Sequence, residues 1–166
     1  DFGDRLDYNL PENQINYLKN LKKDNENPVI AIVTGGSPMN LSEVHEIADA
    51  VLLVWYPGEE GGHALADIVF GKNAPSGKLP VTFPKSLDQL PEYEDYSMEG
   101  RTYRYMTTDP MYPFGFGLSY NKISLSNIQA SSPEINASKP VTTSVTIKNE
   151  GDFPSEEVIQ LYITCP

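Results

Sequence analysis

Two short apolar runs constrain the fold of this chain more than any other feature. Residues 28–33 and 50–55 are rich in β-branched and aliphatic side chains, and each run is followed by a turn rich in glycine and proline. Because both faces of each run are apolar, the pattern is typical of parallel strands that are buried on both sides. Two strands cannot stabilise an open sheet alone, so we expect the remaining strands upstream of Asp1.

Helical patterns alternate with these runs. Pro11 suits the first turn of a helix, and apolar residues follow it at helical spacing. Ser42 is placed to cap a second, short helix that reaches about Ala48. A third helix is expected over residues 63–70, with Gly71 at its C-terminal end. The alternation of strand, turn and helix predicts an α/β fold with a parallel sheet.

The second half of the chain has a different character. Residues 85–120 are rich in Pro, Gly and Tyr, which predicts an ordered connecting region whose aromatic side chains pack together. Residues 121–166 are expected to be all-β, because 141–147 and 158–163 alternate in polarity around a turn at 149–152. These would be the first strands of a β-sandwich that needs about seven strands to close.

Composition excludes several classes of function. The net charge of -11 and the pI of about 4.5 argue against partners such as nucleic acid and anionic membranes, and fit a neutral ligand. The single cysteine, Cys165, rules out an internal disulfide, and His45 and His63 lack metal-ligand spacing. The glycine fingerprints of phosphate-binding loops and the serine nucleophile elbow are also missing from the sequence.

Acidic and aromatic positions after the second apolar run are candidates for a ligand cleft. Glu59 and Glu60 follow a buried run and precede a helix, where ligands of open α/β sheets bind; they would be either functional carboxylates or first-turn helix acids. Trp55, together with Tyr56, would either stack on a sugar or belong to the core. Arg101 lies among tyrosines, and there a structural lock is favoured over a ligand contact.

At this point a family resemblance becomes specific. Residues 55–84 closely resemble the second-domain signature of family 3 glycoside hydrolases. Four further matches occur in the order of that family, and together with the signature they extend over nearly the whole chain. They are Gly3-Asp4-Arg5 with Leu10-Pro11 and Gln14, then 100–105, 112–120 and 157–162.

The resemblance implies a domain organisation. Members of the family have a (β/α)8-type barrel, an (α/β)6 sandwich and often a fibronectin type III-like domain. On that pattern residues 1–84 are the C-terminal half of the (α/β)6 sandwich, with its parallel sheet. Residues 85–120 connect it to a truncated fibronectin type III-like domain at 121–166, of which the first strands are present.

The resemblance also implies a mechanism. Family members are retaining enzymes that use an Asp nucleophile on the barrel and a Glu acid/base on the sandwich. By the family pattern both lie upstream of Asp1, so no catalytic residue is expected in this chain, and the isolated chain should be inactive without its barrel domain. Trp55, Glu59 and Glu60 remain as candidates for the cleft rim. No metal and no cofactor are implied.

The substrate that the resemblance implies is an oligosaccharide or aryl β-glycoside with a terminal β-linked sugar. Residues 95–99 resemble the β-xylosidase branch more than others, although β-glucosidase activity stays open. The family also favours a secreted or periplasmic location. The alternative is a non-catalytic carbohydrate-binding or structural module that carries the sandwich without the barrel.

Overall fold

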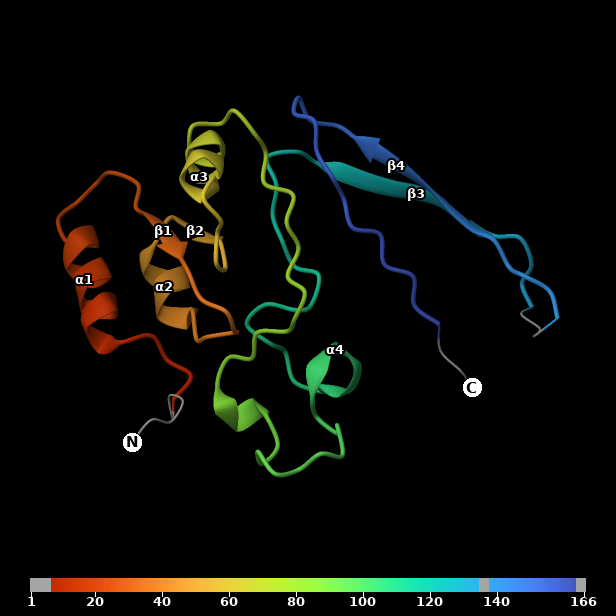
Figure 1. Ribbon diagram of the computed structural model, residues 1–166, viewed down its shortest axis with the longest axis horizontal. Helices are drawn as coiled ribbons and strands as arrows, with labels where there is room; N and C mark the ends of the chain where they lie inside the picture. The colour runs from red at the N-terminus through yellow and green to blue at the C-terminus, as the bar shows by residue number, and fades with distance from the viewer. Residues whose placement is uncertain (1–6, 135–137, 164–166) are drawn as a thin grey trace. The chain divides into compact units, whose positions relative to one another are not determined.

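The structure is a computed structural model that describes residues 7–134 and 138–163 (Figure 1). The Gly3-Asp4-Arg5 element and Cys165 lie outside the described residues. Within them the chain forms two compact units, which we call the α/β unit and the hairpin unit. The α/β unit comprises residues 7–62 and 78–116, and the hairpin unit comprises residues 63–77, 117–134 and 138–163.

A two-stranded parallel sheet lies at the centre of the α/β unit. Strand β1 (Ile30–Val33) pairs with β2 (Ala50–Leu53), with Ile30 opposite Ala50 and Val33 opposite Leu53. This confirms the parallel pairing that the two apolar runs predicted. The two faces of β1 differ in burial among the described residues: Ala31 is 7% exposed, whereas Ile32, which points to the other face, is 49% exposed. In the described residues, packed side chains cover one face of β1 only.

Two helices of the α/β unit match the sequence patterns, and Figure 1 shows them beside the sheet. Helix α1 (Glu12–Lys22) follows Pro11, which takes the N-cap position. Helix α2 (Ser42–Ile47) comes after β1 and before β2 along the chain. The predicted capping role of Ser42 was wrong, because Ser42 is itself the first helical residue. The side-chain oxygen of Asn40 accepts the Ser42 N–H at 3.0 Å instead.

The hydrophobic core of the α/β unit joins segments that are far apart in sequence. Ile15 of α1, Val33 of β1 and Val44 of α2 pack with Phe83, which has no exposed surface. The backbone of Phe83 pairs with a neighbouring segment, since its N–H donates to the carbonyl of Tyr112 at 2.9 Å. Residues near 83 are therefore tied to the sheet by apolar packing and to residues near 112 by hydrogen bonds.

The part of the α/β unit after Phe83 contains little regular structure. A 3-10 helix at Leu87–Gln89 and helix α4 (Thr102–Tyr105) are its helical elements among the described residues. Aromatic rings stack here: Tyr103 lies on Phe114 with ring centroids 4.5 Å apart. A second stacked pair, Tyr112 and Phe116, has centroids 5.0 Å apart.

The hairpin unit is built on an antiparallel pair of strands. Strand β3 (Ile123–Ala130) pairs with β4 (Thr143–Asn149). The strand predicted over 158–163 was wrong, since these residues form no strand and have no ladder partner in the described chain. Alternation of polarity produces a strand only when an adjacent backbone edge is present.

Helix α3 (Gly61–Val69) contributes most of its length to the hairpin unit. It ends as predicted before Gly71, which has a φ of +70° that suits glycine. The Tyr120 hydroxyl donates to the carbonyl of Ile68 at 2.8 Å, so the chain that leads into β3 is tied to this helix. In the part of the chain that the structure describes, no helix is long and apolar enough to cross a membrane.

Candidate functional site

The carboxyl ends of β1 and β2 lie at the same edge of the sheet because the strands are parallel. The pairing continues past the strands, where the Val54 N–H donates to the Val33 carbonyl at 2.9 Å. The Gly35 N–H then donates to the carbonyl of Trp55 at 3.2 Å. Trp55 is thereby fixed beside the glycine turn that follows β1, at the edge where open α/β sheets place their ligands.

Trp55 has an unusual backbone for a residue with a large side chain. Its φ is +49°, in the left-handed region that costs a non-glycine residue about 1 kcal/mol or more. The half-buried ring packs against Phe83 with centroids 6.1 Å apart. It also lines a cavity of about 310 Å³ with Gly36, Pro38, Pro80 and Val81. Trp55 therefore belongs both to the edge of the core and to a surface cavity.

Glu59 and Glu60 lie in the turn that leads into α3, and both are exposed. Neither lines this cavity or the larger one next to it. The structure thus places Trp55 at a cavity wall and leaves the two glutamates on the neighbouring turn. Carboxylates at such a position can accept hydrogen bonds from the hydroxyl groups of a ligand.

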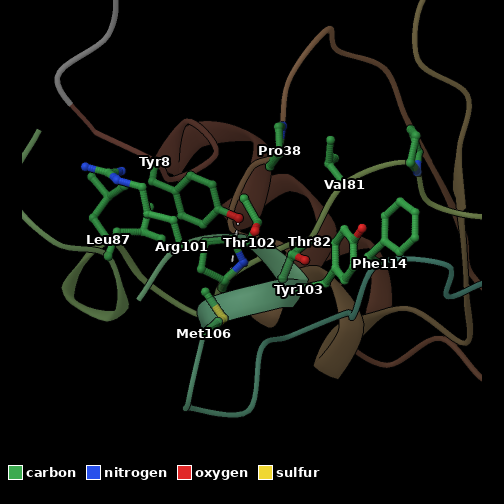
Figure 2. Close-up of a pocket in the computed structure, with 13 residues that line it drawn as sticks. Tyr8, Pro38, Val81, Thr82, Leu87, Arg101, Thr102, Tyr103, Met106 and Phe114 are labelled. Carbon is green, nitrogen blue, oxygen red and sulfur yellow. Dashed lines mark hydrogen bonds between the residues drawn. The ribbon is translucent and has the colours of Figure 1, made fainter. Parts of the chain in front are cut away.

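A larger cavity of about 450 Å³ opens next to the first (Figure 2). Pro38, Pro80 and Val81 line both cavities, so the two are contiguous. The walls are mostly apolar, and they come from five separate stretches of the chain. The remaining lining residues are Tyr8, Thr82, Pro84, Leu87, Leu90, Arg101, Thr102, Tyr103, Met106 and Phe114.

Sequence reasoning missed this larger cavity. Its residues belong to short segments that carry no local pattern in common, and only the fold assembles them. The one available signal was the order of the family motifs, since the stretch after residue 79 and the stretch around residue 101 each contain a motif. The motifs mark these segments as typical of the family, but they do not indicate that the segments lie next to one another in the folded chain.

Polar groups in the wall of the larger cavity are mostly bound to the protein itself. The Tyr8 hydroxyl donates to the Pro84 carbonyl at 3.1 Å, and burial raises the pKa of Tyr8 to about 12, so the group stays neutral. The Thr82 hydroxyl oxygen is buried and has no hydrogen-bond partner among the described residues. The cavity therefore offers ligands an apolar surface with few free polar groups.

Arg101 acts as a structural lock, as the sequence favoured. Its guanidinium donates to the backbone carbonyls of Glu92, at 2.8 Å, and Asp95, at 3.0 Å. The backbone N–H and the hydroxyl of Ser97 lower the pKa of the Asp95 carboxyl, and Arg101 adds a smaller effect of the same sign. These contacts close the loop between residues 92 and 101 and leave the guanidinium engaged with that loop.

The site as a whole is suited to binding. Aromatic and proline side chains form its walls, and exposed carboxylates stand beside it. In the described residues no group of three or more His, Cys, Asp or Glu side chains is arranged to hold a metal ion. A neutral ligand with apolar faces and hydroxyl groups matches these surfaces in polarity.

Comparison with known proteins assigns the chain to a family. The model of the glycosyl hydrolase family 3 C-terminal domain matches residues 1–120. A xylan 1,4-beta-xylosidase of Xylanibacter ruminicola is 45% identical over 161 residues, which cover 97% of this chain and 18% of that protein. A periplasmic beta-glucosidase of Salmonella typhimurium is 37% identical over 171 residues, which cover 96% of this chain and 22% of that protein. The chain spans about a fifth of the length of these curated relatives.

Solved structures agree with this assignment. A beta-glucosidase of Listeria innocua in complex with isofagomine matches 89% of this chain and 22% of its own, with a TM-score of 0.70 and 33% identity. Beta-glucosidase 3B of Thermotoga neapolitana matches with a TM-score of 0.75 and 28% identity, over 89% of this chain and 23% of its own. The mixed α/β model with its small parallel sheet is consistent with these neighbours, and the chain belongs to glycoside hydrolase family 3.

Proposed function

We propose that this chain is the C-terminal-domain part of a retaining β-glycosidase that removes terminal β-linked xylose or glucose. The observation that carries the proposal is the 45% identity over 97% of the chain to a protein named as a xylan 1,4-beta-xylosidase. Relatives named as beta-glucosidases are less similar but are aligned over the same span. The substrate is an oligosaccharide or an aryl β-glycoside, and xylose is the favoured terminal sugar.

In this proposal the reacting carboxyl groups lie outside the 166 residues. A retaining enzyme needs two carboxyl groups about 5–5.5 Å apart, one as nucleophile and one as acid/base. The family pattern places both upstream of Asp1, on the barrel and on the first part of the (α/β)6 sandwich. The chain then contributes the rest of the sandwich, and Trp55, Glu59 and Glu60, which follow β2, form part of the cleft rim.

We propose that residues 121–166 begin a fibronectin type III-like domain and that residues 85–120 connect it to the sandwich. Support comes from the antiparallel pair β3–β4 and from the alternating polarity of segment 158–163, a pattern typical of a strand in a larger sheet.

Hydrolysis of nitrophenyl β-xyloside and nitrophenyl β-glucoside tests the proposal. The complete gene product that contains this chain should release nitrophenol, with the β-xyloside as the better substrate, and the anomeric configuration should be retained. The 166-residue chain alone should show no turnover. Turnover by the isolated chain would contradict the placement of the catalytic groups. An inactive complete gene product would instead favour a non-catalytic carbohydrate-binding or structural module.

A further inference from the structure

Tyr56 is a large aromatic side chain that is 80% exposed and whose ring lies against Gly36. Its ring edge rests on Gly36: a Cβ added to Gly36 would lie 2.6 Å from Cε2 of Tyr56 and 3.1 Å from its hydroxyl oxygen. Only the missing side chain of the glycine makes this approach possible. The rest of the ring surface stays open to solvent, so the contact orients the ring without covering it.

The backbone next to Tyr56 fixes the direction in which the ring leaves the sheet. Trp55 has a positive φ, and its carbonyl accepts the Gly35 N–H at 3.2 Å. The turn after β1 and the end of β2 are therefore joined just where Tyr56 approaches Gly36. Such a strained and cross-linked segment presents its side chains with little freedom, which lowers the entropy lost when a ligand binds.

Gly36 connects the exposed ring to the smaller cavity. It lies under Tyr56 and also lines the cavity of about 310 Å³ together with Trp55 and Pro38. An exposed aromatic ring thus stands at the border of a pocket whose wall contains a second aromatic ring. The volume is at the lower end of the range of about 300–1,000 Å³ found for small-molecule sites, which suits a single ring.

The chemistry of this place selects the ligand. An aromatic face attracts C–H groups that carry partial positive charge, and one face of a β-linked pyranose is a layer of such groups. The net charge of -11 disfavours anionic ligands, and the exposed carboxylates of Glu59 and Glu60 on the following turn can accept hydroxyl hydrogen bonds. A neutral sugar satisfies all three conditions.

We infer that Tyr56, positioned by Gly36 and bordering the Trp55 cavity, forms an aromatic subsite for one neutral pyranose ring of a β-linked oligosaccharide. The inference rests on the proposed function and adds to it a specific contact residue. Tyr56 binds the sugar by stacking. Gly36 is a positioning residue, because it acts only by letting the ring lie where it does.

Trp55 is the only tryptophan of the chain, so its fluorescence reports on this place alone. Titration of the 166-residue chain with xylotetraose should give a saturable change in emission. Tyr56→Ala should weaken binding about fivefold to tenfold, which corresponds to the loss of one aromatic contact. Gly36→Ala should weaken it less than Tyr56→Ala does, because the end of the Tyr56 side chain can move away from the added Cβ, and Tyr56→Phe should retain most of the affinity.

Tyr93→Ala is the matched control, since Tyr93 is 87% exposed and lines neither cavity. It should bind xylotetraose like the unsubstituted chain, and far-UV circular dichroism checks that each variant is folded. The inference is overturned if the unsubstituted chain gives no saturable change. It is also overturned if Tyr93→Ala weakens binding as much as Tyr56→Ala, or if Tyr56→Phe binds as poorly as Tyr56→Ala.

Glycoside hydrolysis separates this inference from the proposed function. If the complete gene product hydrolyses nitrophenyl β-xyloside while xylotetraose does not bind at Tyr56, the aromatic subsite is refuted and the glycosidase assignment stands. If xylotetraose binds as expected but the complete gene product hydrolyses no glycoside, the glycosidase assignment fails and the sugar subsite stands.

Discussion

Different kinds of interaction stabilise the α/β unit and the hairpin unit, each within itself. The α/β unit buries Leu41, Val44 and Phe83 almost completely. Among the described residues of the hairpin unit, no hydrophobic side chain is buried to that degree, and the most buried side chain is the polar Asn121. Burial of apolar surface is the main source of stability in folded proteins, so the α/β unit should carry most of the resistance to unfolding.

The hairpin unit relies on a turn that is built from side-chain amides. Asn121 donates to the Phe153 carbonyl at 2.8 Å and accepts the Phe153 N–H at 3.2 Å, and Asn149 donates to the same carbonyl at 2.7 Å. Each such bond adds about 1 kcal/mol net, because water competes for the same groups. A unit held in this way keeps its shape but opens more easily than one with an apolar core.

The largest effect should come from Phe83→Ala. Removing a fully buried phenylalanine from the core should lower the free energy of unfolding of the α/β unit by about 3–5 kcal/mol. Trp55 fluorescence in a urea titration measures this, because the rings of Trp55 and Phe83 are neighbours. Phe70→Ala is the matched control: Phe70 is 80% exposed, so its effect should stay within about 0.5 kcal/mol. Equal shifts for the two variants would mean that no apolar core distinguishes the units.

The second effect, on the hairpin unit, should come from Gly151→Ala. A Cβ at Gly151 would lie 2.9 Å from the Cα of Asn121, so the amide-built turn would have to open. We expect a loss of about 1–3 kcal/mol, measured as faster hydrogen exchange of β3 and β4 amides. The Val54 amide of the α/β unit should keep its protection.

Gly77→Ala is the control for that experiment. Gly77 also belongs to the hairpin unit, but nothing lies within 4 Å of a Cβ placed there. Its substitution should leave exchange at β3 and β4 nearly unchanged. If Gly151→Ala instead exposed the Val54 amide as much as the hairpin amides, the two units would unfold together and the contrast between them would be lost.

The same contrast explains which features the sequence predicted. The pairing of β1 with β2 and the positions of α1, α2 and α3 follow from local periodicity, and they were confirmed. Local periodicity failed where the outcome depends on a partner. The exposure of Ile32 and the lack of a ladder for residues 158–163 both reflect which surfaces lie next to these segments. No pattern within a segment contains that information.

The larger cavity beside the candidate site could not be predicted from the sequence for a related reason. Trp55 was selected because it follows an apolar run, and the structure places it at a cavity wall. Tyr8, Pro38 and Arg101 meet at the larger cavity although they are far apart in sequence, and no motif signals that meeting. The close approach of Tyr56 to Gly36 was equally hidden, because a glycine after a strand is expected for turn geometry alone.

A third, smaller effect should come from Tyr8→Phe in the α/β unit. The substitution removes the hydrogen bond to the Pro84 carbonyl, which should lower the free energy of unfolding by about 0.5–1.5 kcal/mol. This is less than for Phe83→Ala, because in this unit apolar packing outweighs polar contacts. Urea midpoints at neutral pH measure the difference between the variant and the unsubstituted chain.

The pKa of Tyr8 also predicts how the free energy of unfolding changes at alkaline pH. Burial raises the pKa of Tyr8 to about 12, so the fold favours the neutral phenol. The stability that Tyr8 adds is therefore complete below the ordinary tyrosine pKa of about 10 and is lost as the pH rises toward the folded value. Tyr8→Phe should lose less stability than the unsubstituted chain over that range. Equal alkaline losses would show that Tyr8 is not buried in solution.

The smallest effect should come from Asp49→Asn, which removes an exposed polar contact from the same unit. The Asp49 carboxylate accepts one hydrogen bond from the Lys22 ammonium at 2.6 Å and another from the Val29 N–H at 2.7 Å. The hydrogen bond from Lys22, and after it the one from Val29, lower the pKa of Asp49. The linked stability is therefore present above the ordinary aspartate pKa of about 3.9 and is lost as the pH falls through the lowered value.

Acid titration of the urea midpoint tests this last prediction. In Asp49→Asn the urea midpoint should fall slightly less than in the unsubstituted chain as the pH is lowered. Added salt should reduce the difference between the two proteins, because exposed ion pairs are screened. If Asp49→Asn destabilised the α/β unit at neutral pH as much as Gly151→Ala destabilises the hairpin unit, polar contacts would be equally important in both. The difference between the units would then lie only in how much apolar surface each one buries.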